Sequence, residues 1–284
     1  MRNLILSLAL LLSFSLISRA QIPTPTERSW KIGGVERQAL VYAPAAATKS
    51  KSPLIFAFHG HGGNMRYSMN AYHYHREWPE AIVVYMQGLP TPGGLTDPQG
   101  LKNGWQGRVG LQGDRDLKFF DTVLTSMKKD YLIDEKRIFA AGHSNGGGFT
   151  YLLWSERPDV FAAFAPAAAF TLRANSLKPK PAIHIGGESD PLVKFAWQKR
   201  CMDAVMKVDG CSTTGKEWAK SGDLVCTMYP SSTGTPFVTA IFPGNHTYPK
   251  EAPALTVKFF KEVTGVKASP QESTQAEHKQ RYCT

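Results

Sequence analysis

Three residues with the side chains of a nucleophile, a base and an acid stand out by their positions. Ser144 lies in Gly142-x-Ser144-x-Gly146, after a short apolar run and before a segment with helical spacing. Asp190 and His246 each follow a later apolar run. A serine hydroxyl is a poor nucleophile at neutral pH, so it needs an adjacent base that an acceptor holds in place. The pattern predicts nucleophilic catalysis by Ser144, with His246 as base and Asp190 as acid.

The glycines beside Ser144 have a steric purpose in this interpretation. A serine at a sharp turn between a strand and a helix adopts strained backbone angles, and a Cβ on the flanking residues would collide with those elements. The motif fixes only three letters, and taken alone it also describes a turn between two ordinary elements. The strand and helix patterns on either side of it favour the catalytic interpretation.

Two other polar residues compete for places in this site. Glu188 stands two residues before Asp190 and is the rival acid. His184 lies inside an apolar run, where a hydrogen-bonded core histidine is the better interpretation. The order serine, aspartate, histidine, each at the end of a successive strand, is the order of the α/β-hydrolases.

The reaction also needs hydrogen-bond donors aimed at the oxyanion of the tetrahedral intermediate. The amide of Asn145, directly after the nucleophile, is predicted to be the first donor. A glycine-rich turn, residues 59–63, follows an earlier apolar run and allows close approach to a substrate. The amide of His61 is predicted to be the second donor, with that of Gly62 as the alternative.

The histidine pairs His59/His61 and His73/His75 raise the question of a metal. An oxyanion turn explains the first pair, and the second pair is expected at the surface. Because no cysteine or carboxylate cluster completes a ligand set, no metal or other cofactor is expected.

Strands and helices alternate along the chain and must position these residues. Short continuous apolar runs predict buried strands at 53–58, 81–86, 160–168, 182–186 and 237–242. Helical patterns are found at 64–78, 114–131, 145–156, 191–208 and 257–263, the second of them capped by Asp114. Segments 29–32 and 37–42 flank Gly33-Gly34 and predict an antiparallel hairpin at the N-terminal end of the sheet. These patterns predict an α/β-hydrolase fold, whose mostly parallel central sheet has helices on both faces and the site at the carboxyl ends of its strands.

A long segment from Gln87 to Gly113 contains eight glycines and three prolines and shows no periodicity. Long loops of this kind are usually functional or disordered, so it is expected to form one wall of the cleft beside Ser144. Trp105 is its only large aromatic residue. We expect Trp105 either to plug the core or to form a substrate-binding platform for a flat acyl group or a sugar ring.

The composition indicates one exported catalytic domain. Residues 1–20 combine an early arginine, an apolar stretch and small residues before Ala20, which predicts a signal peptide cleaved after Ala20. The predicted parts are this peptide, a lead at 21–28, the catalytic domain at 29–265 and a polar tail at 266–284. Removing Arg2 and Arg19 with the signal lowers the net charge from +10 to +8. The basic residues are scattered, so no nucleic-acid partner is expected. The apolar stretch is shorter than a membrane span and no cysteine stands at the cleavage point, so no membrane anchor is expected after cleavage, and the protein is expected to be secreted or periplasmic.

The chain resembles the secreted polyhydroxybutyrate depolymerase and feruloyl esterase group, which is related to carbohydrate esterase family one. The resemblance rests on the His-Gly turn, on Gly-Asp-x-Asp-Leu at 113–117, on Gly-His-Ser-Asn-Gly-Gly, on Gly-Gly-Glu-Ser-Asp-Pro and on Asn-His-Thr-Tyr-Pro. His61 and Tyr248 depart from the usual pattern of the group. The resemblance implies a disulfide between Cys211 and Cys226, which would leave Cys201 to pair with Cys283; four cysteines allow three pairings.

The expected activity is hydrolysis of carboxylic esters by a secreted serine esterase. Feruloyl or acetyl esters of plant polysaccharide are favoured as substrates over polyhydroxybutyrate oligomers, because the glycine-rich surroundings leave room for a flat acyl chain. The competing interpretations are a serine peptidase on the same fold and a binding protein that has lost its activity. An intact set of serine, aspartate and histidine argues against the last of these.

Overall fold

The computed structural model describes residues 22–266. The expected signal peptide, most of the expected tail and Cys283 lie outside the described residues. No helix in the described part of the chain is long and apolar enough to cross a membrane.

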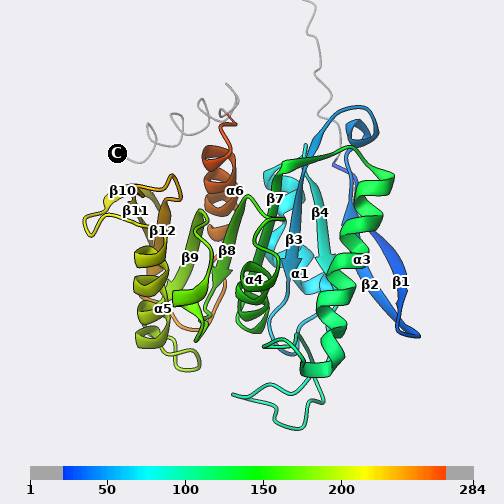
Figure 1. The fold of residues 1–284 in the computed structure, drawn as a ribbon, viewed down its shortest axis with the longest axis horizontal. Helices are drawn as coiled ribbons and strands as arrows, with labels where there is room; N and C mark the ends of the chain where they lie inside the picture. The colour runs from blue at the N-terminus through cyan, green and yellow to red at the C-terminus, as the bar shows by residue number, and fades with distance from the viewer. Residues whose placement is uncertain (1–21, 267–284) are drawn as a thin grey trace, which may run out of the picture.

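A twisted sheet of ten strands forms the centre of the molecule, in the order β1-β2-β4-β3-β7-β8-β9-β12-β11-β10 (Figure 1). The strands are β1 (Thr26–Ile32), β2 (Val35–Tyr42), β3 (Ser52–Phe58), β4 (Ile82–Met86), β7 (Ile133–His143), β8 (Ala163–Ala167), β9 (Ala182–Gly187), β10 (Lys216–Ser221), β11 (Leu224–Tyr229) and β12 (Phe237–Phe242). The six strands from β4 to β12 run parallel, and antiparallel strands extend the sheet at both ends. The predicted mostly parallel sheet is confirmed, because its inner strands are the continuous apolar runs that burial on two faces requires.

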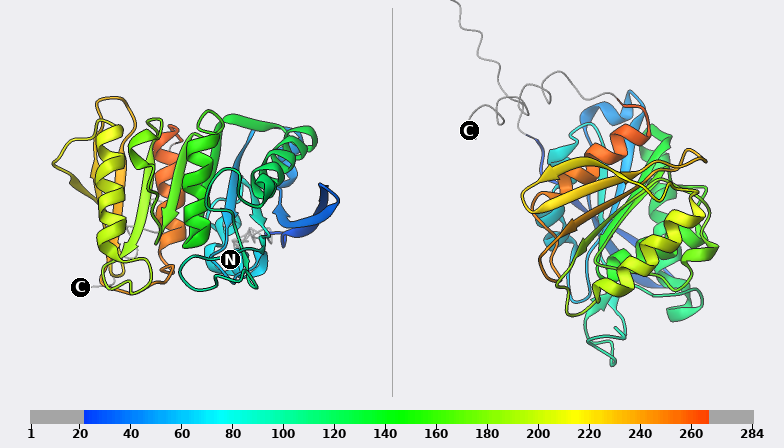
Figure 2. Two further views of the ribbon diagram at one scale, coloured as in Figure 1. Left: turned by 60° about the horizontal axis from the view of Figure 1, so that its bottom comes forward. Right: turned by 90° about the vertical axis from the view of Figure 1, so that its left-hand side faces the viewer.

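Helices cover both faces of this sheet (Figure 2). They are α1 (Met65–Tyr72), α2 (Tyr74–Glu77), α3 (Arg115–Asp130), α4 (Asn145–Glu156), α5 (Phe195–Val208) and α6 (Ala252–Val263). Buried side chains of α3, α4 and α5 join one hydrophobic cluster, and those of α1, α2 and α6 join a second cluster on the opposite face. The chain thus forms three layers, and loops at one end of the sheet are free to build a site.

The hairpin predicted around Gly33 and Gly34 is present at one edge of the sheet. Both glycines have positive φ, which a tight two-residue turn requires, and Ile32 pairs with Val35 across it. The first strand begins at Thr26, inside the lead that was expected to precede the domain.

The opposite edge of the sheet is built from residues 209–234, a segment for which the sequence patterns predicted no strand. This segment contains the hairpin of β10 and β11, which pairs with β12. β10 forms the exposed edge and is mainly polar, whereas β11 lies between β10 and β12 and alternates buried Leu224 and Cys226 with more exposed side chains, so neither shows the fully buried run of an inner strand. The Gly222-Asp223 dipeptide between them, with φ of +57° at Gly222, is the local hairpin signal that was missed.

Two predicted helices also differ in detail. The helix expected at 64–78 is divided at His73, whose φ of 30° lies in the left-handed region. Asp114 precedes α3 but does not cap it, because its own φ is 57° and its carboxylate accepts hydrogen bonds from Gln106 Nε2 and Gly110 N instead. Asp114 therefore fixes the preceding loop rather than the helix end.

Candidate active site

Ser144 occupies a strained turn between β7 and α4. Its φ of 57° and ψ of −122° are unusual for a residue with a side chain. An added Cβ at Gly142 would lie 2.4 Å from the carbonyl oxygen of Gly146, and one at Gly146 would lie 2.2 Å from that of Phe58. The two glycines are therefore required sterically, and the turn that they permit places Ser144 Oγ at the carboxyl edge of the sheet.

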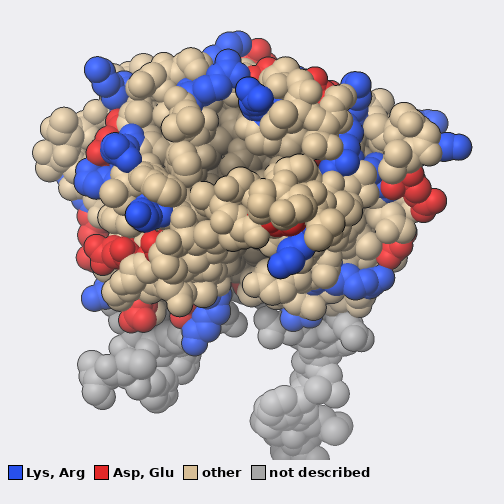
Figure 3. Space-filling view, turned by 90° about the horizontal axis from the view of Figure 1, so that it is seen from below, with Lys and Arg blue, Asp and Glu red and all other residues tan. Residues whose placement is uncertain are grey.

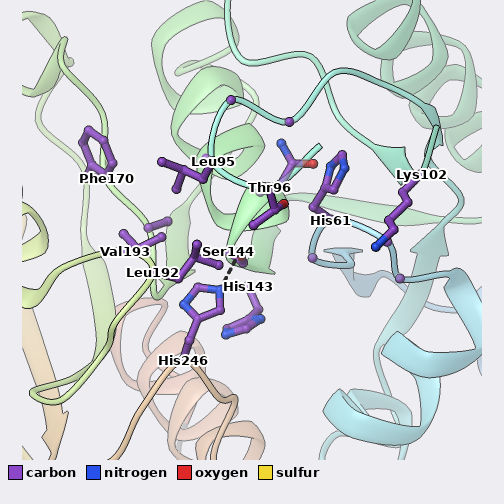
Figure 4. Close-up of a pocket in the computed structure, with 18 of the residues that line it drawn as sticks. His61, Leu95, Thr96, Lys102, His143, Ser144, Phe170, Leu192, Val193 and His246 are labelled. Atoms are coloured by element: carbon purple, nitrogen blue, oxygen red, sulfur yellow. Dashed lines mark hydrogen bonds between the residues drawn. The ribbon is translucent and has the colours of Figure 1, made fainter. Parts of the chain in front are cut away.

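Asp190, His246 and Ser144 form a continuous hydrogen-bonded chain. Asp190 Oδ2 lies 2.7 Å from His246 Nδ1, and His246 Nε2 lies 2.8 Å from Ser144 Oγ (Figure 4). The three residues follow β9, β12 and β7, so the parallel sheet brings together positions far apart in sequence. Because Nδ1–H donates to the carboxylate, Nε2 is left as the acceptor for the serine hydroxyl.

The carboxylate of Asp190 is held in place from three directions. Its Oδ1 accepts hydrogen bonds from the amides of Leu192 and Val193, at 2.9 and 2.8 Å. Its Oδ2 also accepts one from Gln198 Nε2, at 3.2 Å. Gln198 is fully buried in α5 and was not singled out from the sequence. A glutamine in a helix after the acid loop carries no motif, and only the packing of α5 on β9 brings it to Asp190.

The two alternative polar residues, Glu188 and His184, both lie outside the hydrogen-bonded chain of Asp190, His246 and Ser144. Glu188 is exposed, whereas Asp190 is buried and contacts His246. His184 is fully buried, and its two ring nitrogens pair with Tyr151 Oη and Gln198 Oε1. It is the hydrogen-bonded core histidine that its apolar surroundings predicted.

Two residues that line the same cleft as Ser144 have backbone amides without an acceptor among the described residues. These are the amides of Asn145, at the start of α4, and of His61, in the turn after β3. The amide of Gly62, the alternative donor, instead donates to Asn103 O at 2.7 Å. Of the alternatives His61 and Gly62, only the amide of His61 therefore remains without an acceptor among the described residues.

The side chain of His61 ties its turn to the long loop. Its Nε2 lies 3.0 Å from Asp97 Oδ2, and the same oxygen accepts the amide of Lys102 at 2.8 Å. These contacts lower the pKa of Asp97, with the Lys102 amide as the largest cause. The histidine that departs from the group's usual pattern thus has a structural partner of its own in this chain.

Aromatic rings pack against His246 and the loop that carries it. The ring of His143 lies 4.9 Å from that of His246 and 6.0 Å from that of Tyr248, measured between centroids. Burial, and secondarily the nearby His246, lowers the pKa of His143 to about 3, so it is neutral at ordinary pH. Tyr248 Oη in turn lies 2.7 Å from Tyr74 Oη, which anchors the loop to α2.

The other histidines of the two pairs have protein partners. His59 Nδ1 donates to Gly60 O, and its Nε2 accepts the amide of Gly88. His75 is buried rather than at the surface, contrary to expectation, because its ring packs beside Tyr85 and its Nδ1 bonds that hydroxyl at 2.8 Å.

Trp105 is a core plug and not a substrate platform, so the predicted substrate-binding role is wrong. Only 1% of its surface is exposed, and its Nε1 donates to His59 O at 2.9 Å. Its ring stacks on Phe149 and meets Phe58 edge-on. A buried indole needs one acceptor and close apolar packing, and this site under the loop supplies both.

A buried ion pair fixes the end of the long loop behind Trp105. Arg37 and Asp116 lie 2.8 Å apart with almost no exposure. Asp116 Oδ2 also accepts the amide of Gln106, whose side-chain oxygen accepts the amide of Asp116 at 3.1 Å. The second aspartate of the Gly-Asp-x-Asp-Leu motif therefore connects the loop to α3 and β2.

The implied disulfide between Cys211 and Cys226 is absent: both residues, and Cys201, are free thiols. Cys211 packs against the hydrophobic cluster on one face of the sheet, and Cys226 is buried in the cluster on the other. Two cysteines on opposite faces cannot approach within bonding distance. The other proposed partner, Cys283, lies outside the described residues.

Ser144 and His246 line a cleft of about 850 Å³. Figure 3 shows the molecule from this end, with a hollow bordered mainly by uncharged residues. Leu95, Phe170, Leu192 and Val193 line one part of the cleft. The cleft is also lined by residues 60–63 of the glycine turn, by Tyr67 and by Lys102. In Figure 4, His61 lies between Phe170 and Lys102. This volume is typical of a site for a small organic ligand.

The fold and this arrangement define a protein of the α/β-hydrolase class with a serine, histidine and aspartate in hydrogen-bonded order. Two sequence relatives are particularly informative. The chain is 27% identical over 229 residues to feruloyl esterase C of Emericella nidulans, which covers 79% of this chain and 80% of the relative. It is 29% identical over 166 residues to a bifunctional acetylxylan esterase/xylanase of Neocallimastix patriciarum, which covers 57% of this chain and 22% of the relative. The predicted resemblance to the feruloyl esterase group is confirmed.

Solved structures support the fold. An acetyl xylan esterase from Aspergillus awamori matches with a TM-score of 0.60 at 14% identity, over 85% of this chain and 100% of that one. A ferulic acid esterase from Anaeromyces mucronatus matches with a TM-score of 0.55 at 12% identity, over 88% and 93%. The prolyl oligopeptidase family model matches residues 105–182, the segment around the nucleophile turn.

Proposed function

We propose that this protein is a serine esterase that hydrolyses carboxylic esters through an acyl-enzyme, with feruloyl or acetyl esters of plant polysaccharide as its substrates. The observation that carries the proposal is the continuous contact from Asp190 through His246 to Ser144, beside the unpaired amides of His61 and Asn145. The esterase relatives support the ester bond and the type of acyl group.

The geometry supports a two-step reaction. His246 Nε2 takes the proton of Ser144 as Oγ attacks the ester carbonyl, and the amides of His61 and Asn145 donate to the resulting oxyanion. The imidazolium then gives its proton to the leaving alcohol, and Asp190 stabilises the charged ring meanwhile. A water molecule, activated by the same imidazole, attacks the acyl-enzyme and releases the acid.

We propose that the acyl group binds in the apolar part of the cleft. Leu95, Phe170, Leu192 and Val193 offer an apolar, mainly aliphatic lining that suits a feruloyl ring or a short acyl chain. Trp105 has no part in this surface. Specificity for an aromatic acyl group would then depend on Phe170 rather than on the tryptophan.

The experiment that tests the proposal compares kcat/KM on methyl ferulate, acetylated xylan and hydroxybutyrate oligomers, with p-nitrophenyl acetate as the general ester. We expect turnover of p-nitrophenyl acetate, inhibition by a serine-directed phosphonate, and the highest kcat/KM on one of the two plant esters. A preference for hydroxybutyrate oligomers would replace the carbohydrate ester with the polyester alternative.

A serine peptidase is the second candidate, because the prolyl oligopeptidase family model matches residues 105–182. That segment contains the turn at Ser144 but neither Asp190 nor His246, so the match does not distinguish a peptidase from an esterase. Cleavage of a proline-containing p-nitroanilide faster than any ester would favour the peptidase. We further propose that residues 1–20 export the protein, which N-terminal sequencing of the mature chain would test.

A further inference from the structure

Lys102 brings a positive charge into a cleft that has no acid in its lining. It lines the same cleft as Ser144 and His246, and no described residue that lines the cleft is Asp or Glu. In Figure 4 it stands on the far side of His61 from Phe170, so it is separate from the apolar part of the cleft.

Backbone hydrogen bonds hold residue 102 in place, and its exposed side chain extends from there along the cleft. Its amide donates to Asp97 Oδ2 at 2.8 Å, and its carbonyl accepts the amide of Thr91 at 3.0 Å. The aliphatic stem lies over the glycine turn, where an added Cβ at Gly62 would be 3.5 Å from Lys102 Cδ. Because Asp97 also holds His61, the lysine is tied to the turn that carries an oxyanion donor.

The ammonium group itself has no partner among the described residues. Some surface lysines are paired, as Lys199 is with Asp203 and Lys258 with Glu262, whereas others, such as Lys129, have no ion pair among the described residues. The carboxylate nearest in the loop, that of Asp97, is occupied by His61 and by the amide of Lys102. An unpaired ammonium in a partly enclosed cleft attracts an anion more strongly than one on open surface.

We propose that Lys102 forms a subsite for a carboxylate carried by the ester substrate, next to the reacting ester. The inference rests on the proposed esterase function and deepens it. The carboxylate has two possible sources, a uronic-acid sugar as the alcohol or an acidic acyl chain. The proposed carbohydrate substrate favours the sugar, and Tyr67, which lines the same cleft and is 57% exposed, presents an aromatic face on which a sugar ring packs.

Two matched substrate pairs test the subsite and distinguish the sources. The alcohol pair is the acetyl ester of methyl galacturonoside against that of methyl galactoside. The acyl pair is p-nitrophenyl hemisuccinate against p-nitrophenyl butyrate. We expect kcat/KM to favour the charged member of the alcohol pair by about five-fold at low ionic strength, and this ratio to shrink in about 0.5 M NaCl. A preference in the acyl pair instead would support the subsite and place it on the acyl side.

Variants then assign the preference to the lysine. Lys102→Met should bring the ratio close to one, and Lys102→Arg should keep it. Lys129→Met removes an exposed lysine at the end of α3 remote from the cleft, and it should keep the wild-type ratio. If Lys102→Met does not fold, Lys102→Gln and the salt dependence of the wild-type ratio take its place.

The outcomes also separate this inference from the proposed function. Equal kcat/KM within both pairs, with ordinary turnover of p-nitrophenyl acetate, overturns the subsite and leaves the esterase intact. A ratio that is unchanged in Lys102→Met overturns the assignment to Lys102. An enzyme that cleaves none of these esters overturns the proposed function itself.

Discussion

Asn145 and Trp105 exchange two hydrogen bonds between a side chain and a backbone. The amide of Trp105 donates to Asn145 Oδ1 at 2.7 Å, and Asn145 Nδ2 donates to Trp105 O at 3.1 Å. Asn145, the residue after Ser144, therefore holds the long loop with its side chain, and its own amide has no acceptor among the described residues. This contact couples the shape of one cleft wall to the start of α4.

We predict that Asn145→Ala lowers both stability and kcat. The substitution keeps the amide of residue 145 but removes both hydrogen bonds and leaves the buried Trp105 backbone groups unpaired, which typically costs about 1–3 kcal/mol. Thermal unfolding and kinetics on p-nitrophenyl acetate would measure the two effects. Asn175→Ala, at an exposed position, is the matched control, and an Asn145→Ala enzyme that behaves like it would show the contact to be unimportant.

Ser144→Ala should remove ester hydrolysis without loss of the fold. Losing a member of such a triad typically lowers kcat by about four orders of magnitude or more, since the remaining groups cannot supply the nucleophile or its base. His246→Ala and Asp190→Asn should be comparably severe. Glu188→Gln is the control, because that residue is exposed; if it lowered kcat more than Asp190→Asn, the acid would have to be reassigned.

Trp105→Ala should act on stability first. Truncation of a fully buried tryptophan removes its stacking on Phe149 and its bond to His59 O, and the expected loss is about 3–5 kcal/mol. Urea denaturation would measure it. Trp105→Phe should recover most of this loss, and the relative kcat/KM for ferulate and acetate esters should match that of the wild type. A selective rise of KM for the ferulate would restore the platform interpretation.

The thiols of Cys211 and Cys226 should be free in the purified protein. Burial raises the pKa of both thiols to about 11, so they should react slowly with alkylating reagents in the native state and quickly in denaturant. Alkylation in urea without reductant, followed by peptide mapping, should find both residues modified. A peptide in which Cys211 is linked to Cys226 would contradict the structure.

Stability should fall as the pH falls below 6.5, because four buried histidines resist protonation. Burial lowers the pKa of His59, His75 and His184 to about 4 and that of His143 to about 3. Below pH 6.5 the unfolded chain binds protons that the folded chain does not, and each histidine then contributes a slope of about 1.4 kcal/mol per pH unit. Asp209 has the opposite effect on stability. Burial raises its pKa to about 7, so below pH 7 the folded chain binds a proton that the unfolded chain binds only at lower pH.

Urea unfolding at pH 7 and pH 5 would measure this dependence. The free energy of unfolding should be lower at pH 5, because the four histidines outweigh Asp209 and His73, whose raised pKa values act in the opposite direction. His184→Gln should flatten the slope by one histidine's share. A free energy of unfolding that is equal or higher at pH 5 would be incompatible with neutral buried histidines.

The sequence by itself determined the parallel part of the fold and the members of the proposed triad. The inner strands are continuous apolar runs, and the turn at Ser144 is a local motif whose glycines avoid steric clashes. Both can therefore be recognised from residues that are neighbours in the sequence. Placement of Asp190 and His246 followed because the carboxyl ends of parallel strands share one edge of the sheet. These inferences needed no knowledge of which side chains meet across the core.

Only the tertiary structure decided the features that depend on contacts between distant segments. Trp105 has polar and glycine neighbours in sequence, and its burial follows from Phe58, Phe149 and the His59 carbonyl, which no local pattern places beside it. The free state of Cys211 and Cys226 depends on which face of the sheet each occupies. In both cases the chain folds back over long distances, and the energy of packing, rather than local preference, selects the partners.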